Sequence, residues 1–155
     1  MSRLPLAAAL AICLAVVAQA EPLSRSMDEA QLDLESTFSP TDQFVRCAGL
    51  QRAQVGLREL SGDQAARLAD ASNLIAAAQF VSSGLFDDPN GLSKEEADRA
   101  ADVMAKQYEF RILGLRAMTN DPGAMPELVI NDERACRSLI AASERIVERA
   151  AELRQ

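Results

Sequence analysis

Four long stretches of this chain repeat apolar residues every three or four positions, a pattern that leaves few folds open. The most regular of them is the last, residues 132–155. Such a repeat places the apolar residues on one side of an α-helix, and that side must be buried against another element. In the last stretch the apolar face consists of Cys136, Leu139, Ile140, Ser143, Ile146, Val147, Ala150 and Leu153.

Capping signals predict where the first three helices begin. A serine before a helix satisfies backbone N–H groups of the first turn, and Glu or Gln three residues later completes a capping box. The signals are Ser39 followed by Pro40, Ser61 with Gln64, and Ser93 with Glu96. They predict helices at about 40–60, from 61 to about 82, and from 93 to the TNDPG turn. Gly49 and Gly56 lie seven residues apart on nearly one face of the first helix, where they would allow another helix to approach closely.

The third predicted helix has the widest apolar arc. Such an arc can be covered by more than one neighbouring helix. A near-heptad stripe contains Ala97, Ala101, Met104, Tyr108, Arg111, Leu115 and Met118, with Val103, Phe110, Ile112 and Leu113 beside it.

The segment between residues 120 and 131 is predicted to be a loop. Its run ELVI could form a strand, but the sequence offers no second strand with which it could pair. We interpret the run as an apolar staple over the end of the bundle. The fourth helix is then expected to be capped by Asn131.

These patterns predict an all-α fold, an up-and-down bundle of about four helices formed by residues 39–155. Residues 21–38 precede it as a polar N-terminal segment. For this segment two outcomes stay open, a short helix that docks on the bundle or an unanchored terminus. The helical alternative is suggested by the spacing of Met27, Ala30, Leu34 and Phe38.

Residues 1–20 have the features of a secretory signal peptide. Arg3 supplies a positive charge, residues 4–17 are apolar, and the small-x-small motif AQA ends at Ala20 before Glu21. The apolar run is about fourteen residues long, short of the roughly 20 that a bilayer-spanning helix needs. We therefore expect cleavage between Ala20 and Glu21, a periplasmic or secreted bacterial protein, and no transmembrane segment after cleavage.

Removal of this leader leaves two cysteines, Cys47 and Cys136. The third, Cys13, follows a sequence that loosely resembles a lipidation signal, but Ile12 stands where that signal has a small residue. In the oxidising periplasm cysteines pair, and two of them allow one intramolecular connectivity. A disulfide between Cys47 and Cys136 is therefore expected to join the first and last long helices.

The motif RCAGL around Cys47 and the later ACRSL around Cys136 resemble those of small exported bacterial helical proteins with a CAGL…C cysteine pair. The resemblance covers the two cysteine-bearing helices and implies the same disulfide. It implies no activity.

Several catalytic chemistries are excluded because the chain contains no histidine. Ser-His-Asp and Cys-His catalysis need an imidazole, as does the Glu-x-x-His di-iron site of helical bundles. Neither a metal site nor a cofactor is expected, since zinc-ligand and nucleotide-binding motifs do not occur. One loop resembles a calcium site, but it lacks the acidic residues that an EF-hand has at its first and twelfth positions. Carboxylates at Asp87, Asp88 and Glu95 remain for a carboxylate-based enzyme, although a turn and a helix cap also explain them.

Four residues are candidates for a binding face. Gln51 and Arg111 are polar residues on apolar helix faces, where they could hydrogen-bond a ligand or a partner. Such residues also extend toward solvent at the edge of a helix interface. Met104 and Met118 could form an adaptable apolar patch, although core packing is the commoner role of methionine.

The formal net charge of −7 disfavours binding to nucleic acid and to anionic lipid. The sequence therefore predicts a small, non-catalytic periplasmic protein that binds a protein partner in the cell envelope, as an inhibitor, an immunity-type protein or a chaperone accessory. Its acidic surface could steer a basic partner. Two alternatives stay open, a carrier of a small apolar ligand in the bundle core and a carboxylate-based enzyme.

Overall fold

The computed structural model describes residues 23, 25–32, 39–57, 63–83 and 91–153, and within these ranges it contains helices and no β-strand. The all-α fold class is therefore confirmed. The helices are α1 (Met27–Leu32), α2 (Pro40–Gly56), α3 (Gln64–Ser83), α4 (Lys94–Thr119) and α5 (Glu127–Glu152). Predictions made for Ala20, Glu21, Ser61, Asp87 and Asp88 lie outside the described residues.

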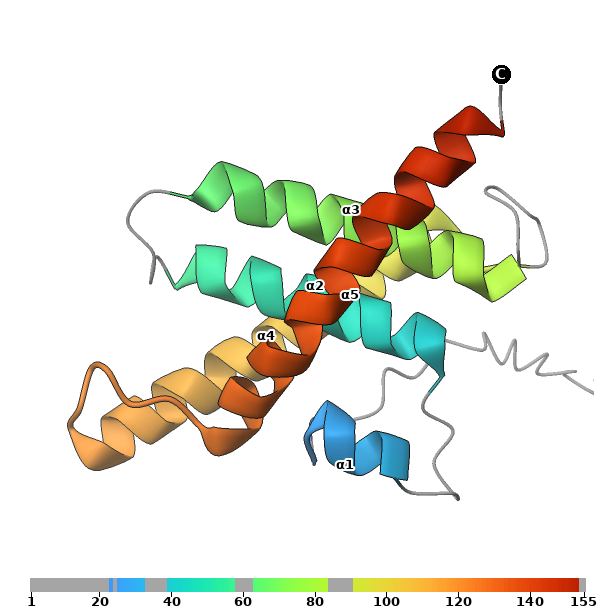
Figure 1. The fold of residues 1–155 in the computed structure, drawn as a ribbon. Helices are drawn as coiled ribbons and strands as arrows, with labels where there is room; N and C mark the ends of the chain where they lie inside the picture. Colours follow the sequence, from blue (N-terminus) through green and yellow to red (C-terminus); the bar gives the residue numbers. More distant parts are fainter. Residues whose placement is uncertain (1–22, 24, 33–38, 58–62, 84–90, 154–155) are drawn as a thin grey trace, which may run out of the picture.

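Helix α2 is the central helix of the molecule. It packs against both α3 and α4, and α5 crosses α2 and α3 obliquely (Figure 1). Most residues of α2 between Phe44 and Gln54 are buried, because neighbouring helices cover this helix on several sides. The short α1 lies against α5. The up-and-down order of the helices stays a prediction.

The capping signals position two helices as predicted. At the start of α2, the N–H of Asp42 donates to the Oγ of Ser39 (3.2 Å), and the N–H of Ser39 donates to the Asp42 carboxylate (2.8 Å). Ser93 and Glu96 form the same reciprocal pair at the start of α4. These bonds satisfy N–H groups that a first helical turn leaves without partners. Helix α4 ends at Thr119, and the capping residue Asn120 has a left-handed backbone (φ 53°), which asparagine adopts more readily than most residues other than glycine.

The start of α5 differs from the prediction. The helix begins at Glu127, directly after Pro126, so the loop interpretation of the run ELVI and the cap at Asn131 are wrong. Val129 is fully buried, and it lies three residues before the buried Asp132. The buried face of α5 therefore extends one turn further toward the N-terminus than the sequence pattern suggested. Pro126 is the N-cap residue of α5, and it makes no side-chain capping hydrogen bond.

Of the two outcomes left open for residues 21–38, the structure shows a short docked helix, α1. Met27 and Ala30 are buried, as their helical spacing suggests. Leu34 and Phe38 lie outside the described residues. The chain before the bundle therefore contributes to the core through α1.

Cys47 and Cys136 join α2 to α5. Their sulfur atoms lie 2.08 Å apart, at disulfide-bond distance, and their Cα atoms lie 5.5 Å apart, as the predicted pairing requires. Both residues are fully buried. Met27 of α1 covers the pair, with its Sδ 3.9 Å from the Sγ of Cys47. Three helices therefore meet at this bond.

Gly49 allows α2 to approach α4 closely, as the spacing of the glycines predicts. A Cβ atom at Gly49 would overlap the Cβ of Met104 and would lie 2.9 Å from the carbonyl oxygen of Ala101. At Gly56 a Cβ would lie 2.6 Å from the side chain of Glu109, which is flexible. The contact at Gly49 involves backbone and Cβ atoms that cannot move independently of α4.

Gly49→Ala should therefore destabilise the protein by about 1–3 kcal/mol, because the overlap outweighs the roughly 1 kcal/mol advantage of alanine in a helix. The matched control is Gly114→Ala in α4, where a Cβ meets no atom within 4 Å. This control should stabilise the protein by roughly 0.5–1 kcal/mol. Urea denaturation measures both changes. If Gly49→Ala were as stable as Gly114→Ala, the close packing of α2 on α4 would be refuted.

Candidate functional site

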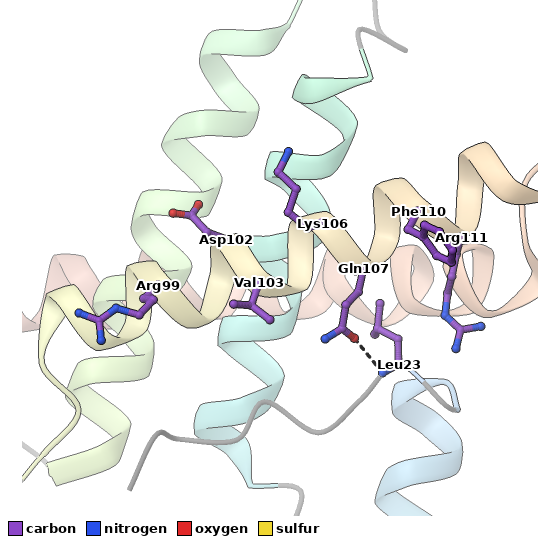
Figure 2. A pocket seen from close by; sticks show the side chains of 8 residues that line it. All are labelled: Leu23, Arg99, Asp102, Val103, Lys106, Gln107, Phe110 and Arg111. Carbon is purple, nitrogen blue, oxygen red and sulfur yellow. Dashed lines mark hydrogen bonds between the residues drawn. The ribbon is translucent and has the colours of Figure 1, made fainter. Parts of the chain in front are cut away.

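A groove of about 790 Å³ runs along α4 (Figure 2). Among the residues that the structure describes, its lining residues belong to α4 except Leu23, which precedes α1. The groove therefore depends on one long helix and on the chain that enters the fold. Its lining residues are Leu23, Arg99, Asp102, Val103, Lys106, Gln107, Phe110 and Arg111.

Val103, Phe110 and Leu23 form the apolar part of this α4 groove. Phe110 is 79% exposed and Val103 is 47% exposed, although both are large apolar residues. They lie seven residues apart, about two helical turns, so they project from the same side of α4. Apolar side chains that gather at the surface of a protein mark interaction sites more often than isolated ones do.

A hydrogen bond holds Leu23 in the wall of the groove. The N–H of Leu23 donates to the Oε1 of Gln107 at 3.1 Å, and Figure 2 shows the Gln107 side chain directed toward Leu23. Leu23 is buried. Since this bond joins residues 84 positions apart, the groove forms only when the N-terminal chain lies against α4.

Basic side chains border the α4 groove. Arg99, Lys106 and Arg111 are all exposed. Asp102 is the one carboxylate among the described residues of the lining, and it binds Arg52 of α2 at 2.7 Å. The border of the groove is therefore positive, although the chain carries a formal net charge of −7.

A second cavity of about 310 Å³ is lined by residues of α2, α3 and α5 and by Asp63. Within it, Arg67 donates to the Oε1 of Gln51 at 2.9 Å and also to Gln54. Burial raises the pKa of Asp70, and the nearby Arg67 opposes that rise. The lining carries both acidic and basic side chains, so it does not favour a ligand of one charge over a ligand of the other. Its residues are Gln51, Asp63, Ala66, Arg67, Asp70, Glu133, Arg137 and Ile140.

Arg46, Tyr108 and Asp132 form a buried polar cluster that the sequence patterns did not reveal. The Nε and Nη2 atoms of Arg46 donate to one carboxylate oxygen of Asp132 at 2.9 and 2.7 Å, and the Tyr108 hydroxyl donates to the same oxygen. The other oxygen accepts the N–H of Met27 at 2.8 Å, and Arg46 also donates to the carbonyl of Arg25. The cluster thus joins α1, α2, α4 and α5.

Burial, together with the negative charge of Asp132, raises the pKa of Tyr108 well above its ordinary value, so the phenol stays protonated and remains a donor. Arg46 is 1% exposed and Asp132 is fully buried. Because a ligand cannot reach these groups in the folded protein, we assign the cluster a structural role.

The four predicted binding residues do not share one surface. Arg111 lines the α4 groove, and Met118 is exposed on the same helix but does not line the groove. Gln51 is buried and lines the second cavity. Met104 is buried against Gly49, so the prediction of a binding role for Met104 conflicts with its position in the core.

Among the described residues, no cluster of three or more potential ligands from His, Cys, Asp and Glu is placed to hold a metal ion. In the same part of the chain, the helices lack the length and hydropathy needed to cross a membrane. No protein-family model matches this chain, and the curated proteins and solved structures with which it was compared gave no match either.

Proposed function

We propose that the protein is a non-catalytic binding protein of the bacterial cell envelope, and that the α4 groove is its binding surface. In this proposal residues 1–20 direct export and are then removed, and cleavage after Ala20 leaves Leu23 in the mature chain. An inhibitor, an immunity-type protein or a chaperone accessory would each act by binding another protein.

The observation that carries this proposal is the exposure of Val103 and Phe110 in one concave site. Burying apolar surface of this kind against a partner is favourable by about 25 cal/mol per Å². Aromatic side chains and arginine are also enriched in the cores of protein interfaces. The α4 groove offers both types of side chain, Phe110 at its apolar part and Arg99 and Arg111 at its border.

A catalytic role has less support in the described residues. The chain has no histidine, and Asp132, whose carboxylate accepts several hydrogen bonds, is inaccessible. Glu95 is an exposed residue of the first turn of α4, and Glu96 is engaged in the cap with Ser93. These positions are explained by the start of a helix.

A second candidate function is the carriage of a small apolar ligand. It is favoured by the volume of the α4 groove, since ligand sites occupy roughly 300–1,000 Å³. The core between the helices is a poorer place for such a ligand, because Met104, Tyr108 and Ile112 fill it. Native mass spectrometry of protein isolated from the periplasm would show a bound small molecule, and Phe110→Ser would release it.

Photo-crosslinking in living cells tests the proposed function. A photoreactive phenylalanine analogue replaces Phe110 in one variant and the exposed Arg145 of α5 in the matched control. We expect a covalent adduct with another protein from position 110 and little or none from position 145, because position 110 lies in the α4 groove. Equal yields from both positions, or no adduct from position 110, would contradict the proposal.

A further inference from the structure

The charge around the α4 groove is opposite in sign to that of the chain as a whole. Three cations, Arg99, Lys106 and Arg111, surround the apolar part. Asp102, a carboxylate of the lining, is engaged by Arg52, which also binds Asp98. In an acidic chain, a basic border around exposed apolar residues favours an occupant that carries negative charge.

The groove cations can exchange their present contacts for those of an occupant. Lys106 pairs with Glu109 at 2.7 Å, but the Lys106 side chain is largely exposed, and ion pairs at such positions are weak. Arg99 and Arg111 are exposed at the border. Carboxylates of an incoming segment would therefore replace the weak Lys106–Glu109 ion pair at little cost in free energy.

The spacing along α4 favours a helical occupant. Val103 and Phe110 lie seven residues apart, and so do Arg99 and Lys106. Apolar and flanking charged residues that repeat every seven positions are what one helix presents to a second helix packed alongside it. The spacing also sets the length of the occupant, because the twelve residue-to-residue steps from Arg99 to Arg111 span roughly 18 Å at 1.5 Å per step.

From this arrangement we propose that the α4 groove binds an acidic amphipathic helix of a partner protein. Its apolar residues face Val103 and Phe110, and its carboxylates face Arg99, Lys106 and Arg111. This inference rests on the proposed function and specifies the kind of partner. The mode of recognition is that of an amphipathic helix laid into a hydrophobic groove.

Two other occupants fit the observations less well. A second copy of the chain packed on the same face would place Arg99 opposite Arg111 or opposite Arg99, depending on its direction, and these like charges repel. An anionic bilayer would match the cations, but the net charge of −7 opposes its approach, and a bilayer is flat where this site is hollowed.

Two fluorescently labelled peptides of about 18 residues test the inference, a length that covers the cations of the groove. Both carry the same leucine and alanine face, and one has glutamates where the other has lysines. Fluorescence anisotropy measures their binding to the oxidised protein without its leader. We expect the acidic peptide to bind about tenfold or more tightly than the basic one, because ion pairs with the groove are gained in one case and repulsion in the other.

Variants separate the inference from the proposed function. Arg99→Glu with Arg111→Glu should reverse the peptide preference, whereas the matched reversal of exposed α5 residues, Arg134→Glu with Arg145→Glu, should leave it unchanged. Phe110→Ser should weaken both peptides.

Equal binding of the two peptides, or no binding of either, would overturn the acidic-helix inference. If that equal binding were still weakened by Phe110→Ser, the proposed function would stand. Binding that Phe110→Ser leaves unchanged would count against both. Sedimentation with phosphatidylglycerol vesicles tests the remaining alternative, an anionic membrane surface. Vesicle binding that depends on Arg99 and Arg111 and outcompetes the acidic peptide would replace the partner helix with a membrane surface.

Discussion

Reduction of the Cys47–Cys136 bond should lower the free energy of unfolding by about 4–5 kcal/mol, the largest single effect that we expect. The bond closes a loop of 89 positions, and in the chain-entropy model a loop of that size strongly restricts the unfolded chain. Residual structure in the unfolded state makes this figure an upper one. A domain is typically stable by about 5–15 kcal/mol, so the reduced protein should be close to its folding limit.

Denaturation in guanidinium chloride, with and without reductant, measures this effect. The variant Cys47→Ala with Cys136→Ala is the control, and reductant should not change its stability. A thiol probe added to the native oxidised protein should modify neither cysteine, because both are buried in a bond that Met27 covers. Labelling of Cys47 under these conditions would show that the bond is absent.

Asp132→Asn should lower the free energy of unfolding by about 3–5 kcal/mol, because it removes the buried carboxylate that pairs with the buried Arg46 at 2.7 Å. The substitution retains the volume of the side chain and an oxygen for the N–H of Met27. The loss of stability therefore measures the effect of removing the charge and not an effect of changed packing. Thermal or chemical denaturation measures it, and a change below about 1 kcal/mol would refute the role of the buried pair.

Three further variants control this experiment. Tyr108→Phe removes one donor from the same carboxylate and should be destabilising by about 1–3 kcal/mol. Lys94→Ala removes an exposed ion pair with Asp98 and should change stability by about 0–1 kcal/mol. If Asp132→Asn does not fold, Arg46→Met with Asp132→Leu removes both charges together, and this double variant should fold because apolar residues can replace a buried pair.

Much of the fold could be predicted from short-range patterns. The helix starts at Ser39 and Ser93 depend on pairs of residues three positions apart. Both pairs form capping boxes in the structure, so the local pattern was sufficient to predict these starts. The cysteine pair could be predicted because two cysteines leave one connectivity. The start of α5 was missed because the run ELVI has no local signal that separates a first helical turn from an apolar loop.

The buried cluster could not be predicted, for a different reason. Arg46 and Asp132 are 86 residues apart, and nothing near either residue shows that they meet. Asp132 had a sufficient local explanation at the start of the fourth predicted helix, where a carboxylate favours the helix dipole. Arg46 stands between two residues of a buried run, and that position was the only available signal.

The α4 groove was hidden by the width of the apolar arc on that helix. Periodicity shows which residues share a side of a helix, but it does not show how many neighbours cover that side. Met104 and Tyr108 face the core, whereas Val103 and Phe110 of the same arc face outward. Basic residues at the same seven-residue spacing as the exposed apolar ones were the signal that could have revealed the site.

Binding through the α4 groove is tested most directly by amide chemical shifts of the nitrogen-15-labelled, oxidised protein during titration with the acidic peptide. The largest shift changes should fall on residues 99–111 and on Leu23, and the exposed face of α5 should not respond. Changes centred on the second cavity, around Arg67 and Arg137, would contradict the assignment of the groove as the binding surface.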